Sequence, residues 1–289
     1  MVGVIDVGSN TVRLVVAHGG RQVLSQREML HLGADVELHG AITELKLEAA
    51  GQLVGHYAAA ARAAGAVEVD VLITSPGRQA ENGNELLDVL SSAAACPTRI
   101  LTAVEEARLG FIGAVDVASP PTRRRVAVVD VGGGSAQVVV GTRRDGPMWL
   151  RSIDLGSQRL TSRLLRSDPP GEAALGSARA EAASYLHDFD PPEPRLALAV
   201  GGSARGLKRI AGSRLGSDEL EATLTLLAGT PTIELVARFG IDADRVGTLA
   251  GGAAILAEIQ LRLATPLKVA RGGVREGALL ELERRRVAA

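Results

Sequence analysis

Two stretches of the chain share one pattern of hydrophobic and polar positions. Residues 2–16 read VGVIDVGSNTVRLVV and residues 126–140 read VAVVDVGGGSAQVVV, with seven identities in fifteen positions at a constant offset of 124. In each stretch a β-branched run leads through Asp-Val-Gly and a small polar turn into a second apolar run, which predicts a β-hairpin. A unit that recurs at a fixed offset indicates an internal duplication.

Helical patterns dominate most of the remaining chain. In the first half we expect helices at about 43–64, 81–94 and 105–116, with a strand at about 68–74 between the first two. In the second half we expect strands at about 126–131, 135–141, 147–154 and 196–200. The apolar run 247–263 predicts a packed core helix, and 276–286 predicts an amphipathic helix whose basic end suits a helix C-terminus.

A length of 289 residues suffices for two ordinary domains, with one large domain as the alternative. Residues 116–125 include two prolines and three consecutive arginines, which indicates an exposed connection. We therefore expect a first domain at 1–118 and a second at 119–289. The C-terminal helix, from about residue 276, can pack back on the first domain.

The charge balance narrows the choice of partners. A net charge of −1 gives no overall field that would attract nucleic acid or an anionic membrane, so a polyanion must meet a local cluster of cations. Only three of the 32 basic residues are lysines, so that cluster would be arginine. Scattered aromatic residues argue against a nucleic-acid stacking surface.

The single cysteine, Cys96, excludes an internal disulfide and fits a reducing compartment. The chain shows no signal-peptide pattern and no apolar run of 18 residues. We therefore expect a cytoplasmic protein with no membrane partner.

The turns of the two repeats are candidate anion sites. Gly8 in the first repeat and residues 132–134 in the second can take positive φ and bring main-chain N–H groups close to a ligand. Asp6 and Asp130 precede the turns, where a carboxylate can hold a hydrated Mg²⁺. Either copy alone would be read as a simple tight turn. The duplication, with aspartate in both copies, favours a phosphate-binding function.

Other phosphate-binding and hydrolase signatures are absent from the sequence. There is no G-x-x-x-x-G-K-[ST], no complete G-x-G-x-x-G and no G-x-S-x-G. This argues against a P-loop enzyme, a Rossmann dehydrogenase and an α/β-hydrolase. The five histidines lack the spacing of a zinc site.

Duplicated Asp-x-Gly hairpins followed by helices resemble the actin, sugar kinase and Hsp70 superfamily. Within it the chain is similar to the exopolyphosphatase and guanosine pentaphosphate phosphohydrolase (Ppx/GppA) family, in a short two-domain form. The resemblance rests on DVGSNTVRL at 6–14, DVGGGS at 130–135, TSPGRQAEN at 74–82, EEARL at 105–109, LGSQRL at 155–160 and GGVREG at 272–277. It implies an α/β protein with a two-domain actin-like ATPase (ribonuclease H-like) fold and a ligand cleft between the domains.

The resemblance also assigns roles to individual residues. Glu106 corresponds to the carboxylate that activates the attacking water; the alternative is an ordinary acidic residue in a first helical turn. Arg78 and Arg13 would face phosphate oxygens, whereas Arg159 and Arg275 could equally form ion pairs that lock domains. The implied phosphate-binding set is Gly8, Ser9, Asn10, Arg13, Gly132, Gly133, Gly134, Ser135 and Arg275. Mg²⁺ or another divalent cation would be held by Asp6, Asp130 and Gln137.

Gln137 departs from the family pattern, which usually has glutamate there. An amide still accepts a hydrogen bond, but it lacks the charge that helps to hold Mg²⁺.

Three functions follow from the resemblance. The first is an exopolyphosphatase that releases terminal orthophosphate from inorganic polyphosphate. The second is a phosphohydrolase acting on guanosine pentaphosphate, with guanosine tetraphosphate as a related ligand; six aromatic residues make a stacked purine platform less favoured. The third, suggested by Gln137, is a non-enzymatic sensor of polyphosphate or an alarmone. The family commonly forms dimers, so a homodimer is also an expectation.

Overall fold

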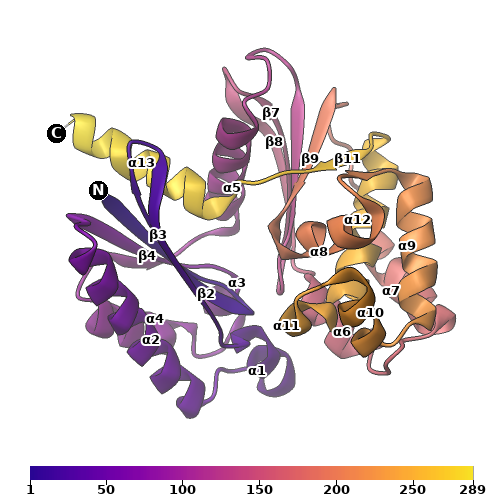
Figure 1. Ribbon diagram of the computed structural model, residues 1–289, viewed down its shortest axis with the longest axis horizontal. Coiled ribbons are helices and arrows are strands. Elements are labelled where there is room, and N and C mark those ends of the chain that lie inside the picture. The colour runs from indigo at the N-terminus through magenta and orange to yellow at the C-terminus, as the bar shows by residue number, and fades with distance from the viewer. Residues whose placement is uncertain (289) are drawn as a thin grey trace. The chain divides into compact units, whose positions relative to one another are not determined.

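The computed structural model describes residues 1–288, which form two compact units (Figure 1). Unit 1 consists of Met1–Gly113 and the C-terminal segment from Val274, and unit 2 of Ala114–Gly273. The sequence placed the boundary at 118, in the exposed connection, whereas the division falls inside helix α5 (Ala103–Ala118). The C-terminal helix α13 (Val274–Ala288) belongs to unit 1 and packs on its first strand.

Unit 1 is built on a five-stranded sheet with the strand order β3-β2-β1-β4-β5. The first three strands form an antiparallel meander, to which the last two add in parallel. The strand bounds are β1 (Val2–Val7), β2 (Thr11–His18), β3 (Arg21–Met29), β4 (Glu68–Ile73) and β5 (Thr98–Ile100).

Alternation along β1 divides its side chains between two packed faces. Ile5 and Val7 join a cluster with residues of α2 and α4, whereas Val2 and Val4 join one with α5 and α13. Asp6 lies on the same face of β1 as Val2 and Val4, so it faces α13. The helices of this unit, besides α5 and α13, are α1 (Leu32–His39), α2 (Glu44–Ala63), α3 (Ser75–Gln79) and α4 (Gly83–Ala94).

Unit 2 is built on a six-stranded sheet with the order β10-β11-β9-β6-β7-β8. Strands β6, β7 and β8 again form an antiparallel meander, and β9 and β11 run parallel to β6. The bounds are β6 (Val126–Val131), β7 (Ala136–Thr142), β8 (Gly146–Ile153), β9 (Leu196–Val200), β10 (Arg214–Leu215) and β11 (Leu267–Val269).

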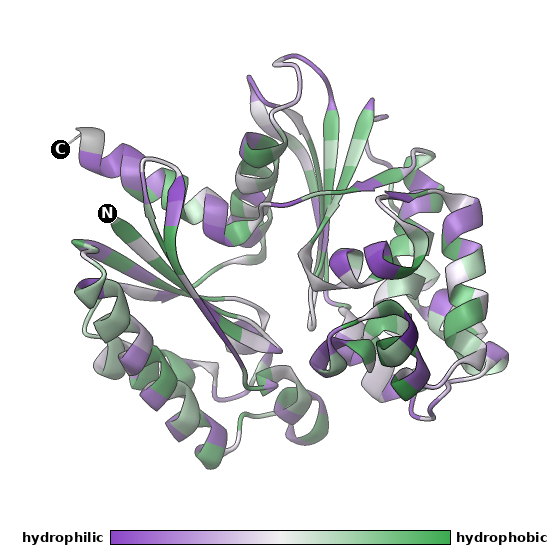
Figure 2. Ribbon diagram, viewed as in Figure 1, coloured by the Kyte–Doolittle hydropathy of each residue, from purple (hydrophilic) through white to green (hydrophobic). Residues whose placement is uncertain are grey.

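Helix α12 (Leu249–Leu263) forms the centre of the unit 2 core and is buried along almost its whole length. It contacts five other helices, which explains why its sequence is apolar on all sides. By contrast, Figure 2 shows α13 mainly as a hydrophilic ribbon with hydrophobic bands. The remaining helices are α6 (Ser157–Leu164), α7 (Glu172–Ser184), α8 (Gly201–Ala211), α9 (Ser217–Gly229), α10 (Thr232–Phe239) and α11 (Ala243–Val246).

The sequence repeat corresponds to a repeat of topology. The order β3-β2-β1-β4-β5 in unit 1 matches β8-β7-β6-β9-β11 in unit 2, with the same strand directions. The predicted α/β, actin-like fold built from two related units is therefore confirmed. Among the described residues, no helix has both the length and the apolarity that a bilayer crossing requires.

Candidate functional site

Both hairpin turns lie where the sequence predicted them, and both have the same internal closure. The N–H of Gly8 donates to the carbonyl of Thr11 at 3.0 Å, and the N–H of Gly132 donates to the carbonyl of Ser135 at 3.0 Å. None of the four turn glycines has a positive φ, so the conformational reason that we gave for them is wrong. A Cβ on Gly8 would lie 3.5 Å from the Thr11 carbonyl oxygen, which is ordinary contact.

A helix N-terminus backs each turn. In unit 1 the N–H of Gly33, in the first turn of α1, donates to the carbonyl of Ser9 at 2.7 Å. In unit 2 the N–H of Ser157 donates to the carbonyl of Gly132 at 2.8 Å, and that of Gln158 to the carbonyl of Gly133 at 2.9 Å. These bonds satisfy amides that would otherwise lack a partner at the helix ends.

This backing fixes the direction of the turn amides. In a trans peptide the N–H points opposite to the preceding C=O. Because the carbonyls of Gly132 and Gly133 are directed at α6, the N–H groups of Gly133 and Gly134 are directed away from it. The carbonyl of Ser9 likewise directs the N–H of Asn10 away from α1. Both turns thus present oriented donors, as an anion-binding turn requires.

The glycine that the second turn needs most is Gly156, immediately before α6. A Cβ there would lie 2.3 Å from the carbonyl carbon and oxygen of Gly133, so any side chain would collide with the turn backbone. The sequence motif LGSQRL marked this segment without revealing the contact. Arg159 in the same motif pairs with Asp154, with Nη1 and Oδ2 2.6 Å apart.

Asp6 in the first hairpin is surrounded by arginine. The register places it opposite Arg13, and Arg275 Nη1 at the start of α13 lies 2.9 Å from Asp6 Oδ2. Burial raises the pKa of the Asp6 carboxyl, although the positive charges of Arg275 and Arg13 act in the opposite direction. Arg275, predicted to bind phosphate, thus makes an ion pair within unit 1.

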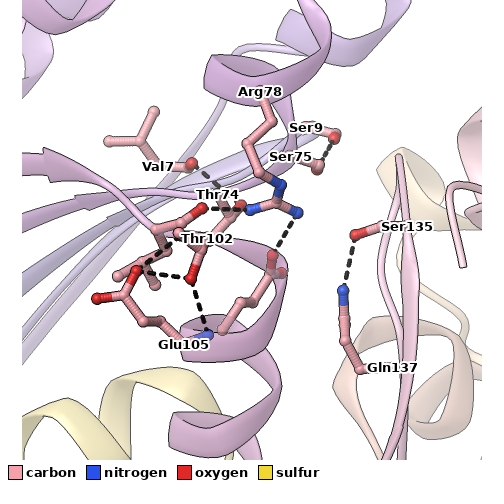
Figure 3. Close-up of polar contacts among 11 residues, drawn as sticks. Val7, Ser9, Thr74, Ser75, Arg78, Thr102, Glu105, Ser135 and Gln137 are labelled. Atoms are coloured by element: carbon pink, nitrogen blue, oxygen red, sulfur yellow. Dashed lines mark hydrogen bonds and ion pairs between the residues drawn. The ribbon is translucent and has the colours of Figure 1, made fainter. Parts of the chain in front are cut away.

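Asp130 in the second hairpin has an amide neighbour in place of an arginine. The register places it opposite Gln137, at the position equivalent to Arg13. Gln137 Nε2 donates to Ser135 Oγ at 2.9 Å, and both side chains are buried (Figure 3). A Cβ on Gly201, which has φ +86°, would lie 2.3 Å from Asp130 Oδ1, so the carboxylate occupies space that only glycine leaves open.

Arg78 and Glu106 form an ion pair between α3 and α5. Arg78 Nη2 lies 2.7 Å from Glu106 Oε2, while Arg78 Nη1 donates to the carbonyl of Leu101 at 2.8 Å. The guanidinium is thereby fixed at two points, and it fixes one oxygen of the carboxylate. The Glu106 side chain is 11% exposed. Arg78, predicted to face phosphate, is placed here as the residue that orients Glu106.

The two adjacent glutamates have different environments. Glu105 Oε2 accepts from the N–H of Thr102 at 2.8 Å, and the N–H of Glu105 donates to Thr102 Oγ1 at 3.1 Å (Figure 3). This is a capping box at the start of α5. These hydrogen bonds lower the pKa of Glu105. Glu105 is therefore a structural residue, which leaves Glu106 as the candidate for chemistry.

Two polar residues that the sequence did not single out complete the first turn. Ser75 Oγ and Ser9 Oγ are 2.7 Å apart, and Thr74 Oγ1 donates to the carbonyl of Val7 at 3.3 Å (Figure 3). Both are buried at the end of β4. They belong to the same TSPGRQAEN motif as Arg78, so the motif that identified one residue also contained the other two.

The donor set decides which residues suit a divalent cation. Among residues 1–288 no group of three or more His, Cys, Asp or Glu side chains converges. Mg²⁺ usually takes one or two carboxylates and fills its shell with water and phosphate oxygens. Asp130 fits this pattern, and Gln137 can add its amide oxygen because its nitrogen is engaged with Ser135. Asp6 fits less well because Arg275 already neutralises it.

Comparison with known proteins assigns the family. The model described as the Ppx/GppA phosphatase family matches residues 11–286. The chain belongs to the Ppx/GppA phosphatase family. The predicted family is therefore confirmed, and with it the prediction of a phosphoric anhydride hydrolase.

Individual relatives agree with this assignment. Exopolyphosphatase 1 of Mycobacterium tuberculosis is 28% identical, over 96% of this chain and 87% of its own length. Exopolyphosphatase 2 of the same organism is 26% identical, over 91% of this chain and 90% of its own length. The crystal structure of an exopolyphosphatase-like protein superimposes with a TM-score of 0.90, covering 98% of this chain and 99% of that one at 24% identity, and supports the fold.

Proposed function

We propose that this protein is an exopolyphosphatase that releases terminal orthophosphate from inorganic polyphosphate by in-line attack of water. The observation that carries the proposal is the position of Glu106. Its side chain is buried and held by Arg78, whereas the neighbouring Glu105 is used to cap α5. A glutamate held in this way can accept a proton from a water molecule. Relatives named exopolyphosphatase favour polyphosphate over guanosine pentaphosphate.

The two turns would supply the remaining chemistry. Their oriented N–H groups suit the oxygens of a phosphate chain, and the Ser135 hydroxyl can donate to such an oxygen because Gln137 occupies it only as an acceptor. A divalent cation, when bound by Asp130 and Gln137, would neutralise charge on the phosphate oxygens. Phosphoryl transfer depends mainly on such positioning and electrostatic stabilisation.

A polyphosphate or alarmone sensor without turnover is the second candidate, because Asp130 has an amide rather than a carboxylate as its cross-strand neighbour. One experiment separates the two. Orthophosphate release from polyphosphate is measured with and without Mg²⁺, for the wild type, Glu106→Gln and Glu105→Gln. An enzyme releases phosphate with Mg²⁺, and we expect Glu106→Gln to lower its turnover number by about 10²–10⁴-fold.

Glu105→Gln is the matched control, because it changes the adjacent carboxylate and leaves Glu106 in place. It should keep most of the wild-type turnover and lose some thermal stability. Full activity in Glu106→Gln would remove the role proposed for that residue. Tight polyphosphate binding without any phosphate release by the wild type would instead select the sensor.

A further inference from the structure

A pocket of about 260 Å³ lies among the helices of unit 2, and none of the candidate site residues lines it. Its apolar walls come from five buried side chains, one directly after α6 and one each on α9, α10, α11 and α12, namely Leu165, Leu227, Leu235, Val246 and Ala250. Figure 1 shows α6, α10 and α11 gathered at one end of this unit.

The polar residues at the rim of this pocket differ in how far they are engaged. Asp168 accepts from Thr232 Oγ1 at 2.6 Å and from the Thr232 N–H at 2.9 Å. Ser167 Oγ donates to the carbonyl of Pro170 at 3.2 Å. Arg166 uses only Nε, which donates to the carbonyl of Ser162 at 3.0 Å; within the described part of the chain its two amino groups contact no carboxylate. Of the two charged residues at the rim, Asp168 thus has its oxygens engaged by Thr232, whereas the amino groups of Arg166 remain available to a ligand.

We propose that this pocket binds a small amphipathic carboxylate, with its chain against the apolar walls and its head at Arg166. The walls favour a hydrocarbon body, and a guanidinium binds a carboxylate through paired, charge-assisted hydrogen bonds. The volume lies just below the range of about 300–1,000 Å³ that accommodates drug-sized ligands, which limits the occupant to roughly ten non-hydrogen atoms. Octanoate has this size and chemistry.

Helix α6 connects the pocket with the second hairpin turn. Its C-terminal end continues into Leu165 and Arg166, which line the pocket, while its first amides bind the carbonyls of Gly132 and Gly133. Along its length it packs tightly on α12, since a Cβ on Gly251 would lie 2.6 Å from Thr161 Oγ1. An occupant that orders the end of α6 therefore also orders the turn amides. The pocket is a regulatory site for the turn.

Binding is tested by titrating octanoate into the full chain by calorimetry, with butyrate as the short-chain comparison. We expect saturable binding of one octanoate and at least tenfold weaker binding of butyrate, because the shorter chain leaves most of the apolar wall uncovered. Ala250→Leu fills the pocket and should abolish binding. Arg166→Ala, an exposed change that leaves the fold intact, should weaken binding by about fivefold.

Arg163→Ala is the matched control, since Arg163 is an exposed arginine near the end of α6, just before Arg166, and does not line the pocket. It should bind octanoate as the wild type does. The absence of saturable octanoate binding would overturn the proposal, as would equal binding by the wild type and Ala250→Leu.

Coupling to the turn is tested by amide hydrogen exchange, which does not depend on catalysis. At ten times the dissociation constant, octanoate should slow exchange at Ser157 and Gln158 by up to about tenfold. The equivalent helix amide behind the first hairpin turn, that of Gly33, should exchange at an unchanged rate. Unchanged exchange at Ser157 and Gln158 with octanoate bound would show that the pocket does not act on the turn.

Discussion

The two hairpins have the same backbone but different side chains opposite their aspartates. Each has a strand whose penultimate residue is aspartate, a turn closed by one hydrogen bond, and a helix N-terminus that binds the turn carbonyls. The residue opposite the aspartate is Arg13 in the first copy and Gln137 in the second. Duplication has therefore preserved the parts that orient backbone amides, while the side chains beside them have diverged.

The different residues opposite the two aspartates suit the two aspartates to different roles. In the first hairpin Asp6 is neutralised by arginine, which ties β1 to the C-terminal helix. In the second, the residue opposite Asp130 is the neutral Gln137, whose buried amide donates to Ser135, and Asp130 Oδ1 fills the space that Gly201 leaves. One aspartate thus serves mainly the fold of its unit, and the other is the better candidate for binding a cation.

The largest expected effect on stability comes from a substitution at Gly156, where α6 packs against the second turn. Gly156→Ala places a methyl group 2.3 Å from the Gly133 carbonyl, where only backbone could move. We expect a loss of about 3 kcal/mol in the free energy of unfolding of unit 2, measured by urea denaturation. Gly8→Ala in the first turn meets only ordinary contacts and should cost less than about 1 kcal/mol. Equal costs at the two positions would contradict the close contact between Gly156 and the Gly133 carbonyl.

The charge on Asp6 gives an intermediate effect. Its pKa is raised from 3.8 in the folded state, so the native protein holds this proton more tightly than the unfolded chain does. The contribution of Asp6 to the stability of the wild type should therefore fall as the pH rises from about 3.8 through the folded pKa, by about 1.4 kcal/mol for each unit of the shift.

Asp6→Asn removes this titration. The free energy of unfolding of the variant, relative to the wild type, should accordingly increase across the same pH range and become constant above it. Chemical denaturation at a series of pH values checks this. A wild type that gains stability relative to Asp6→Asn over that range would reverse the sign and show that pairing with Arg275 outweighs burial.

Periodicity in the sequence was sufficient to predict the long elements. The helices at 44–63, 103–118 and 249–263 and the strands of both hairpins agree with the expected ranges to within a few residues. The strands that it missed are short or polar. β3 is an edge strand whose residues, RQVLSQREM, are mostly exposed, and β10 and β11 have two and three residues, too few for a period to be recognised.

The candidate site was predicted as a list of residues but not as a set of partners. Motifs identified Glu106 and Arg78, yet their ion pair joins positions 28 apart, on two helices that only the folded chain brings together. The same applies to Asp6 and Arg275, which are 269 positions apart. The glycine argument was wrong because the hydrogen bond from the Gly8 N–H to Thr11 closes the turn without positive φ. Tertiary contacts, which leave no local pattern, decide these cases.

The smallest expected effect tests whether a single substitution changes the second hairpin into a stronger cation site. Gln137→Glu places a second carboxylate opposite Asp130, and like charges directly across two strands destabilise by about 0.2–1 kcal/mol. Without divalent cations the melting temperature should fall by roughly 1–3 °C. Mg²⁺ should restore it, because a cation bound by both carboxylates stabilises only the folded chain. Chelation with EDTA should then reverse the gain.

Gln137→Asn, which keeps the amide, should show no greater response to Mg²⁺ than the wild type. If Mg²⁺ raised the melting temperatures of the wild type and Gln137→Glu equally, the charge at position 137 would not govern cation binding, and the contrast between the hairpins would be limited to Asp6 and its arginines.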